Sequence, residues 1–478
     1  MGAGSLALAG QLSNFKILIL IRGFYLKMES QTFESKKVHL ISLGCSRNRV
    51  DAEVMLGTLF ERGWSSTEEP ENADAIVVNT CGFIQSAKEE SIDQILQAGE
   101  LKKSRDLKLV VTGCLSQRYK RQLAEGMPEV DLFIGTDEFT KIADLIEQNS
   151  DEDKVHTKRT NYLYNEQMPR VNTLDKSSAY VKVAEGCQHN CAFCIIPAIR
   201  GKLRSRPIES VVKEVTKLVG DGVKEINLIA QDLAAYGRDK GCDELVPLLR
   251  KLVNIDGLNW VRLLYVYPEN ISEEFLELFA TEEKIVKYLD IPVQHGSNSV
   301  LKRMNRDVSV EHIKDTIKKL RHRIPDVSIR TSVMVGFPGE TESEFLELKS
   351  FVEEMKFDHL GCFTYSKEEG TVAGRMKDQI SEEIKADRQK QIMDIQREVS
   401  LNNLKKMEGR VLPVLVKGPS QESDLLFEGR LSTQAPEVDG VVYVNDGPVK
   451  AGSIQMVEIT ETFDYDLVGR VVDLNSES

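Results

Sequence analysis

The sequence predicts a multidomain α/β protein with an N-terminal parallel α/β domain, a central partial (β/α)6 barrel and a small C-terminal antiparallel β-barrel. Three observations lead to this prediction. The length of 478 residues corresponds to about three domains at roughly 150 residues each. Short apolar runs alternate with amphipathic segments from residue 36 to about 402, as in parallel sheets covered by helices. After residue 403, short β runs separated by Gly and Pro are typical of a small barrel.

Composition and charge are those of an ordinary soluble globular protein. Hydrophobic residues make up 41% and charged residues 29% of the chain, which excludes a disordered or collagen-like protein. Asp and Glu number 75 against 62 Lys and Arg, a formal net charge of −13. Because phosphate binding requires clustered positive charge, nucleic acid is not expected as the substrate unless a local basic patch exists. Eight cysteines are too few for a disulfide scaffold in a chain of this length.

Residues 1–35 are predicted to be an N-terminal extension outside the folded domains. Within it, the apolar run 17–21 lies between Lys16 and Arg22 and is too short for a signal peptide or a membrane-spanning helix. We therefore expect Met28 to be the natural first residue. No other segment is apolar enough over about 20 residues to cross a membrane. The expected location is the cytoplasm, where thiols stay reduced.

The N-terminal domain, residues 36–149, is predicted from alternating strands and helices. The strands are 38–46, 75–83, 107–116 and 131–136, and the helices are 52–63 and 91–103. Ligands of open parallel sheets bind beyond the carboxyl ends of the strands. Cys45, Cys81 and Cys114 fall at three such ends, so three thiols are expected at one edge of this sheet.

Residues 150–178 are polar and predict a linker, and a second α/β region spans residues 179–402. Its strand-like runs are 179–187, 225–232, 260–268, 288–295, 328–340 and 359–366. Amphipathic helical segments such as 209–220 and 344–356 separate these runs. Six units are fewer than the eight of a complete barrel, so we expect an open barrel. Its strand tips end in polar or Gly/Pro residues, as they do where a barrel carries its active site.

The charged stretch 379–406 is predicted to be a connecting helix that leads into a third domain, residues 403–472. The β runs of this domain are 410–418, 425–431, 440–446 and 453–463. From Lys405 to Val472, seven Lys or Arg stand against eleven Asp or Glu, a charge of about −4. The excess acids include Glu422, Asp424, Glu428, Glu437 and Asp439. We expect these acids on the surface of β-hairpins, where they attract a basic partner.

The most specific motif is EGCQHNCAFCIIP, in which Cys187, Cys191 and Cys194 follow the first barrel strand with the spacing C-x3-C-x2-C. Three thiolates in one short loop can hold three corners of a cubane iron–sulfur cluster, which leaves one iron open for a ligand. A zinc site favours paired C-x2-C knuckles and four ligands. His189 is a possible fourth ligand, but its place between two cysteines would strain the loop.

This motif at the tip of the first barrel strand resembles the radical S-adenosylmethionine superfamily. The resemblance implies that the open iron binds the amino and carboxylate groups of S-adenosylmethionine, whose reductive cleavage gives a 5′-deoxyadenosyl radical. Phe193 matches the family position beside the adenine. The segment VGFPGE resembles a later cofactor-contacting segment, which implies S-adenosylmethionine contacts for Gly336, Pro338, Gly339 and Glu340.

The upstream cysteines indicate which family within this superfamily the chain resembles. Singly, each is also compatible with a small buried residue. Jointly, Cys45, Cys81 and Cys114 resemble the N-terminal domain of the radical S-adenosylmethionine methylthiotransferases, which holds a second cubane cluster. The C-terminal module of that family is a TRAM barrel, and the resemblance runs from about residue 36 to 472. It implies two [4Fe-4S] clusters, one that generates the radical and one that carries the incoming sulfur.

Two branches of this family differ in substrate, and the motifs here resemble the branch that modifies a ribosomal protein. The motifs are SLGCSRNRVDAE (42–53), RGKLRSRP (200–207), IAQDLAAYGRD (229–239), LDIPVQHGS (289–297) and YSKEEGT (365–371). The transfer RNA adenosine 2-methylthiotransferase branch has a Gln-Met-Asn run after its first cysteine, where this chain has Ser46, Arg47 and Asn48. The acidic terminal module also favours a basic protein over RNA.

The resemblance implies methylthiolation of the β-carbon of an aspartate in small-subunit ribosomal protein number twelve, with 3-methylthioaspartate as the product. Two S-adenosylmethionine molecules, a sulfur donor and an electron donor such as flavodoxin or ferredoxin are implied partners. The alternatives are the transfer RNA enzyme of the same family and, in another class, a non-catalytic iron–sulfur electron carrier. An electron carrier needs fully ligated clusters, and neither three-cysteine site has an evident fourth ligand.

Several other residues have two readings. The basic run Arg200, Lys202, Arg204 and Arg206 is either an RNA patch or a set of cofactor and protein contacts. Gln294 and His295 lie at a strand tip, where they face substrate or make structural hydrogen bonds. Asp232 and Asp290 are interpreted as structural, since the implied chemistry is radical. Cys242 and Cys362 match neither cysteine set, and Cys362 is expected in the core.

Overall fold

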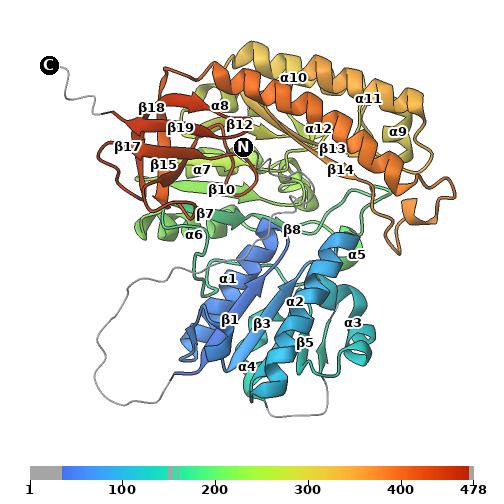
Figure 1. Cartoon of the computed structure of the whole chain (residues 1–478), viewed down its shortest axis with the longest axis vertical. Coiled ribbons are helices and arrows are strands. Elements are labelled where there is room, and N and C mark those ends of the chain that lie inside the picture. The colour runs from blue at the N-terminus through green and yellow to red at the C-terminus, as the bar shows by residue number, and fades with distance from the viewer. Residues whose placement is uncertain (1–34, 149–153, 159–160, 473–478) are drawn as a thin grey trace, which may run out of the picture. The chain divides into compact units, whose positions relative to one another are not determined.

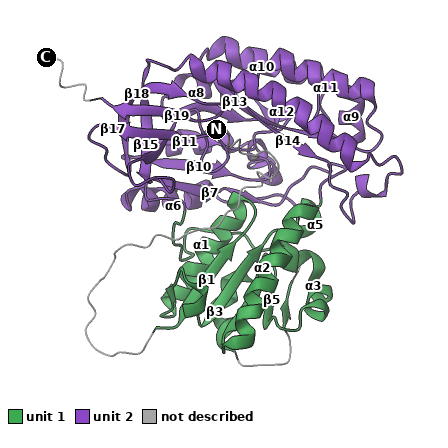
Figure 2. Cartoon of the chain, in the orientation of Figure 1, with its two compact units in different colours: residues 1–173, 195–201 green, residues 174–194, 202–478 purple. Residues whose placement is uncertain are grey.

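The computed structural model describes residues 35–148, 154–158 and 161–472, so nearly all of the predicted N-terminal extension lies outside the described residues. The chain forms two compact units (Figure 2). Unit 1 comprises the chain up to residue 173 together with residues 195–201, and unit 2 comprises residues 174–194 and 202–478. None of the helices in the described part of the chain is both long enough and apolar enough to cross a membrane.

Unit 1 is built on a six-stranded parallel sheet with the order β2-β1-β3-β4-β5-β6. Figure 1 labels β1, β3 and β5 of this sheet. The strands are β1 (Lys37–Ser42), β2 (Ser65–Ser66), β3 (Ala75–Thr80), β4 (Lys108–Gly113), β5 (Leu132–Ile134) and β6 (Val155–His156). The helices are α1 (Ser46–Glu61), α2 (Gln85–Ser104), α3 (Cys114–Gly126), α4 (Ile142–Glu147) and α5 (Ile196–Arg200), with short 3-10 helices η1 (Pro70–Asn72) and η2 (Phe139–Lys141). Two apolar clusters contain alternate residues of β3, Val77 in one and Ile76 in the other. This alternation is expected where both faces of a parallel sheet are covered.

The first helix begins six residues earlier than the predicted range 52–63. Residues 46–51 are polar except Val50, yet Asn48, Arg49 and Asp51 are buried. Their side chains bind partners from other elements, so no amphipathic pattern marks this turn of the helix. Arg49, for example, donates a hydrogen bond to the carbonyl oxygen of Thr173 at 3.2 Å.

Part of the stretch predicted as a linker, residues 150–178, belongs to unit 1 and packs on its sheet and first helix. Strand β6 pairs in parallel with β5 and extends the sheet. Farther along, the buried Glu53 of α1 binds Arg170 at 2.6 Å and accepts a hydrogen bond from the backbone N–H of Thr173 at 2.8 Å. A Cβ atom at Gly57 would lie 2.4 Å from the carbonyl carbon of Pro169, so this segment lies directly on the helix. The sequence did not predict this packing, because the segment is polar and its contacts are made by a buried carboxylate rather than by apolar side chains.

Unit 2 contains a second six-stranded parallel sheet, with the order β14-β13-β12-β11-β10-β7. Its strands are β7 (Ser178–Lys182), β10 (Glu225–Ile229), β11 (Trp260–Leu263), β12 (Ile285–Asp290), β13 (Ser328–Val335) and β14 (His359–Thr364), and β8 (Ala184–Glu185) pairs with β9 (Arg204–Ser205). The helices are α6 (Ile208–Gly220), α7 (Leu245–Leu252), α8 (Glu273–Thr281), α9 (Asn298–Arg303), α10 (Val310–Arg323), α11 (Glu342–Met355) and α12 (Glu382–Lys405), with 3-10 turns η3 (Leu233–Ala235), η4 (Arg238–Lys240), η5 (Pro268–Asn270) and η6 (Ala373–Arg375). The edge strands β7 and β14 do not pair with each other, so the predicted open barrel is confirmed.

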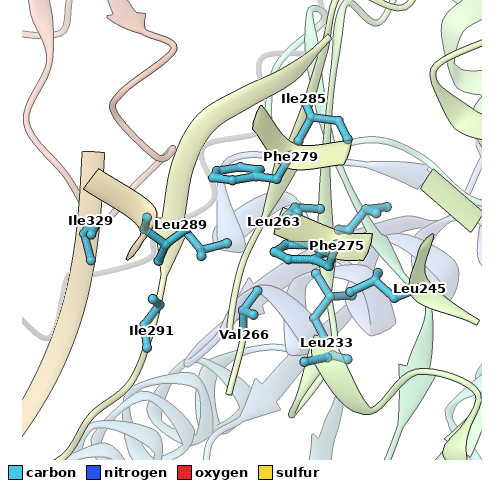
Figure 3. Close-up of a cluster of buried hydrophobic side chains, with 14 of the residues drawn as sticks. Leu233, Leu245, Leu263, Val266, Phe275, Phe279, Ile285, Leu289, Ile291 and Ile329 are labelled. Atoms are coloured by element: carbon cyan, nitrogen blue, oxygen red, sulfur yellow. The ribbon is translucent and has the colours of Figure 1, made fainter. Parts of the chain in front are cut away.

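The core of unit 2 lies between this sheet and its helices. Figure 3 shows part of it, where Phe275 and Phe279 of α8 lie over Leu263, Ile285 and neighbouring aliphatic side chains. Each fully buried aliphatic or aromatic side chain contributes about 1.5–3 kcal/mol to folding. Cys362 of β14 belongs to this core, as predicted, and its burial raises the pKa of the thiol.

The C-terminal module is a closed barrel of five strands, which confirms the remaining part of the predicted fold class. The strands are β15 (Val411–Pro419), β16 (Phe427–Leu431), β17 (Val442–Asp446), β18 (Ser453–Thr462) and β19 (Leu467–Val471). All pairs are antiparallel except β17 with β19, which is parallel. The long connecting helix α12 precedes the barrel, close to the predicted range 379–406.

A buried ionic cluster joins the C-terminal barrel to the amino ends of the parallel strands of unit 2. Glu225, the first residue of β10, binds Arg262 of β11 at 3.0 Å and also pairs with Arg430 of β16. Both Glu225 and Arg262 are fully buried. Burial acts to raise the pKa of Glu225, but the charges of Arg430 and Arg262 outweigh it and lower the pKa to about 2.

A second buried contact corrects the expectation that the acids of the barrel are all at the surface. The side chain of Asp439 is 2% exposed. It accepts a hydrogen bond from the Tyr288 hydroxyl at 2.7 Å and lies 3.4 Å from both Arg330 and His359. Glu437 is half-buried and accepts a hydrogen bond from the hydroxyl of a tyrosine in β7. These two acids therefore hold the barrel on the sheet and are not available to a partner.

The Glu225 cluster predicts a loss of stability in acid. A carboxyl group whose pKa is lowered in the folded state stabilises the protein above its ordinary pKa of 4.5, and this contribution is lost as the pH falls toward 2. The Glu225→Gln variant is expected to be about 3–5 kcal/mol less stable at neutral pH, because it leaves two buried arginines without their charge partner. Thermal unfolding from pH 7 to pH 2 should show the difference between variant and parent shrinking below about pH 4.5. The exposed Glu209→Gln variant serves as the control, and an equally large effect there would contradict the prediction.

Candidate functional site

The upstream site, defined as Cys45, Cys81 and Cys114, lies at three adjacent strand ends of unit 1. Cys45 immediately precedes α1, Cys81 follows β3, and Cys114 is the first residue of α3 after β4. The parallel register pairs Ser42 with Asn79 and residue 80 with residue 113, which brings the three loops to one edge of the sheet. The placement expected from the sequence is therefore the one that the structure has.

Close packing holds two of these loops together. Gly44 has a φ of +88°, and a Cβ atom there would lie 2.8 Å from Cβ of Cys81. Only glycine fits this backbone conformation at this separation. The side-chain amide of Asn48 donates hydrogen bonds to the carbonyl oxygens of Leu43 and Thr80, both at 2.9 Å. One asparagine thus bridges the loop of Cys45 and the loop of Cys81.

The three thiols also interact electrostatically. Burial raises the pKa of Cys81 and of Cys114, and the neighbouring thiols of the upstream site raise both further. For Cys45, burial acts in the same direction, but Arg47 and Arg200 outweigh it, so its pKa lies below the usual value. Three thiolates in one buried place repel one another unless a cationic centre binds them. This donor set suits an iron–sulfur cluster.

The loop site, defined as Cys187, Cys191 and Cys194, lies in unit 2 just after β8. The backbone N–H of Cys194 donates to the carbonyl oxygen of Cys191 at 3.0 Å, and that of His189 donates to Sγ of Cys187 at 3.4 Å. Ala192 fixes the middle of the loop, because its N–H donates to Met304 and its carbonyl oxygen accepts from residue 373, both at 2.8 Å. Hydrogen bonds from elsewhere in unit 2 thus hold the loop that presents the three thiols.

His189 is held by a carboxylate. Its Nε2 lies 2.7 Å from Asp232, which is 2% exposed and also accepts a hydrogen bond from the backbone N–H of Ala234. Its ring stacks on Tyr267 with 4.0 Å between ring centres. These contacts occupy Nε2 of His189 and fix the orientation of its ring. Asp232 has the structural role expected of it, since it orients this loop.

Sequence reasoning missed Tyr267. Its hydroxyl lies 3.6 Å from Sγ of Cys191, and the guanidinium of Arg306 lies 4.1 Å from its ring centre. The burial of Tyr267 raises the pKa of its hydroxyl, with a further contribution from Cys191. The only available signal was its place at the end of a barrel-strand run. An open cavity of about 580 Å³ lies beside this tyrosine and is lined by residues 188–190 and by Glu269, among others.

The segment 335–340 begins at the last residue of β13 and packs against α12. Gly336 has a φ of +74°, and a Cβ atom there would lie 2.3 Å from Lys385. The carboxylate of Glu340 is buried, accepts a hydrogen bond from the N–H of Phe337 and binds Arg388 at 2.7 Å. This carboxylate therefore has partners within the protein; Pro338 is also buried, and Gly339 is half-buried. Phe193 packs against an apolar cluster that includes Phe337.

The structure separates the residues of the basic run. Arg206 is fully buried and pairs with Glu214 at 2.5 Å, and Arg200 is 2% exposed. Only Lys202 is exposed and Arg204 is half-buried, so the run does not form a basic surface for RNA. His295 is buried and accepts a hydrogen bond from the N–H of Ser297.

Other residues singled out from the sequence lie as follows. Gln294 adopts a φ of +72°. Its backbone N–H donates a hydrogen bond to Ser332 of β13, and its carbonyl oxygen accepts one from Met334 of the same strand. Asp290 is buried and binds Arg330 at 3.2 Å, while Cys242 is exposed. Among the described residues, no three His, Cys, Asp or Glu side chains converge as they do around one metal ion. Such convergence is not required for a cubane, because its thiolates bind different irons.

Comparison with known proteins places these features in a family. A model of an uncharacterized protein family, UPF0004, matches residues 37–135. The radical SAM superfamily model matches residues 181–352, and the TRAM domain model matches residues 409–472. A radical S-adenosylmethionine methyltransferase, TsrM from Kitasatospora setae, has the same fold at 15% identity, with a TM-score of 0.51 over 69% of this chain and 75% of that chain. Membership of the radical SAM superfamily implies a [4Fe-4S] cluster and S-adenosylmethionine.

Sequence relatives carry the assignment further and confirm the resemblance predicted from the motifs. The chain is 50% identical over 453 residues to the ribosomal protein uS12 methylthiotransferase RimO of Syntrophotalea carbinolica, covering 94% of this chain and 100% of that protein. The proteins of the same name from Geobacter sulfurreducens and Bdellovibrio bacteriovorus are 47% and 45% identical, over 91% and 93% of this chain and 99% of each of theirs. The chain therefore belongs to the RimO family of ribosomal protein uS12 methylthiotransferases.

Proposed function

We propose that this protein methylthiolates the β-carbon of an aspartate in ribosomal protein uS12 and uses a [4Fe-4S] cluster at each of its two three-cysteine sites. The observation that carries the proposal is the presence of both sites in a chain that matches RimO proteins over nearly their whole length. The six cysteines form no disulfide bonds in the described part of the chain, and the two sites belong to different compact units. Each predicted domain has its own proposed role. Residues 36–149 hold the upstream site, residues 179–402 hold the loop site, and residues 403–472 contact the substrate.

The loop site suits the radical-generating cluster. When bound there, the cluster and S-adenosylmethionine supply a reducing electron and a radical that takes hydrogen from an unactivated carbon. The chain's own contribution is to hold three thiolates on a fixed loop, through Ala192 and the His189–Asp232 contact. Phe193 and the backbone around Gly336 and Gly339 are the proposed cofactor contacts. Hydrogen bonds to the cluster ligands raise its potential, and the N–H of His189 and the Tyr267 hydroxyl are placed for this.

The upstream site suits the cluster that carries the incoming sulfur. Its three thiols come from separate strand ends held together by Asn48 and by the close approach at Gly44. Three protein ligands leave one iron for an exogenous sulfur. The reaction also requires a sulfur donor and a one-electron donor, for which flavodoxin or ferredoxin is proposed. We place the reaction in the cytoplasm, where cysteine thiols stay reduced.

The test is to incubate the anaerobically reconstituted protein with S-adenosylmethionine, sulfide and a reductant, and to offer uS12 and adenosine-modified transfer RNA separately. Mass spectrometry should show a methylthio group on an aspartate of uS12 and none on the transfer RNA. The burial of Arg200 and Arg206 supports this choice, since it removes two charges from an RNA-binding surface. Modification of the transfer RNA instead would assign the chain to the other substrate class. S-adenosylmethionine cleavage without either product would refute both.

The acidic loop of the C-terminal barrel, defined as residues 420–426, is proposed to contact the basic substrate. Glu422 and Asp424 are exposed there, and Leu425 is 84% exposed between them and β16. Reversing both acids to Lys is expected to weaken the apparent affinity for uS12 a few-fold at low salt, at about 0.2–1 kcal/mol per surface charge. The difference should disappear at high salt because mobile ions screen exposed charges.

A matched control separates a local contact from the net charge of the module. The Glu461→Lys/Asp464→Lys variant makes the same change in charge at the exposed end of β18 and the turn that follows it. Affinity is measured for both variants at two salt concentrations. Equal weakening by both variants would show that net charge acts without a specific contact, and no weakening by either would exclude the acidic loop from substrate binding.

A further inference from the structure

Arg200 lies at the upstream site although it follows the loop-site motif in the sequence. It is the last residue of α5, and the segment 195–201 belongs to unit 1. Ile195 and Ile199 of this segment pack against Cys114 and Phe83 in one apolar cluster. The helix is thereby docked on the strand end that carries a cysteine of the upstream site.

The guanidinium of Arg200 is directed at that cysteine. Its NH1 lies 3.0 Å from the carboxylate of Asp51, and its NH2 lies 2.6 Å from the side-chain oxygen of Asn48. The same NH2 lies 3.5 Å from Sγ of Cys114. With only 2% of its surface exposed, Arg200 holds a full positive charge inside the upstream site. It is the charged member of the network through which Asn48 bridges the loops of Cys45 and Cys81.

A purely structural ion pair would not account for this geometry. A buried arginine that only balances Asp51 needs the carboxylate alone, whereas here the second nitrogen of the fork contacts the side-chain oxygen of Asn48 and lies within hydrogen-bond range of the sulfur of Cys114. A neutral thiol is a weak acceptor, and an arginine gains from this contact when the sulfur is a thiolate. Hydrogen bonds and net charge near the sulfurs set the reduction potential of an iron–sulfur cluster.

We propose that Arg200 is a positioning residue of the upstream site, which hydrogen-bonds the Cys114 thiolate of the bound cluster and raises the reduction potential of that cluster. This role rests on the proposed function, in which the upstream site holds an iron–sulfur cluster. Asp51 has the opposite effect, because its negative charge offsets that of the arginine. Removing the guanidinium therefore lowers the potential, and removing the carboxylate charge raises it.

The experiment isolates the upstream cluster in the full chain. In a background with Cys187, Cys191 and Cys194 replaced by Ala, iron content is measured after anaerobic reconstitution, and the midpoint potential is measured by an EPR-monitored redox titration. Arg200→Met is expected to shift the reduced-to-oxidised ratio at a fixed potential at least tenfold toward the oxidised form, about 59 mV for a one-electron couple. Asp51→Asn is expected to shift the ratio in the other direction.

The control is Arg206→Met, which removes another fully buried, ion-paired arginine of the same basic run, in unit 2. It should lower the unfolding temperature and leave the potential of the upstream cluster unchanged. If the Arg200→Met variant does not retain iron, the Arg200→Lys variant is used instead, because lysine keeps the charge without the planar fork. Its midpoint potential is then compared with that of the Asp51→Asn variant.

Opposite shifts for the arginine and aspartate variants support the proposal. A background chain that binds no iron would overturn the proposed upstream cluster and this role with it. Iron bound at an unchanged potential in both variants, or shifts of the same sign, would overturn the role of Arg200 alone.

Discussion

Replacement of Cys187, Cys191 and Cys194 together by Ala is expected to abolish the formation of 5′-deoxyadenosine and to leave about half the iron of the parent chain. Each cubane contains four irons, so two sites correspond to about eight irons per chain and one site to about four. The loop site sits beside Phe193 and the segment that follows β13, the proposed S-adenosylmethionine contacts. Iron is measured chemically, and 5′-deoxyadenosine is measured by chromatography after anaerobic reduction.

The control for this variant is Cys242→Ala. Cys242 is an exposed cysteine that belongs to neither site, so its removal should change neither quantity. Cofactor cleavage at the parent rate in the triple variant would refute the assignment of the loop site. Complete loss of iron in the triple variant would refute the existence of a second cluster.

Replacement of Cys45, Cys81 and Cys114 by Ala is expected to preserve the formation of 5′-deoxyadenosine and to abolish the methylthio product. These cysteines lie in a different compact unit from the loop site, so reductive cleavage of S-adenosylmethionine should continue. No methylthio product should form on uS12, because the sulfur-carrying site is gone. The triple Ser variant, which is closer in size to the parent, separates loss of ligands from loss of packing. Product at the parent yield in either variant would show that the upstream site is only structural.

The strand-end cysteines could be predicted because parallel sheets bring the carboxyl ends of their strands to one edge. The apolar strands, the open barrel and the terminal barrel followed from periodicity in the same way. The C-x3-C-x2-C spacing located the loop site without any knowledge of its surroundings. Each of these predictions depends on residues that are close together in the sequence.

The contacts that could not be predicted join residues far apart in the sequence. Glu225 meets Arg430, and Asp439 meets Tyr288, through registers that no local pattern encodes. For Arg200 the sequence left two readings, an RNA patch or cofactor and protein contacts, because burial of a charge is visible only when its partner is known. The early start of α1 was missed for the same reason, since its first turn buries polar side chains.

Because the segment 195–201 belongs to unit 1, that unit is discontinuous in the chain. During synthesis, residues 1–173 emerge before the helix that covers Phe83 and Cys114 has been made. At about 5–20 residues per second, translation of residues 174–194 takes on the order of seconds, and during this interval the apolar surface around Cys114 is open. A fragment that stops at residue 173 remains in this incomplete state. Expression of unit 1 by itself therefore requires α5 to be supplied, either as a fused segment or as a separate peptide.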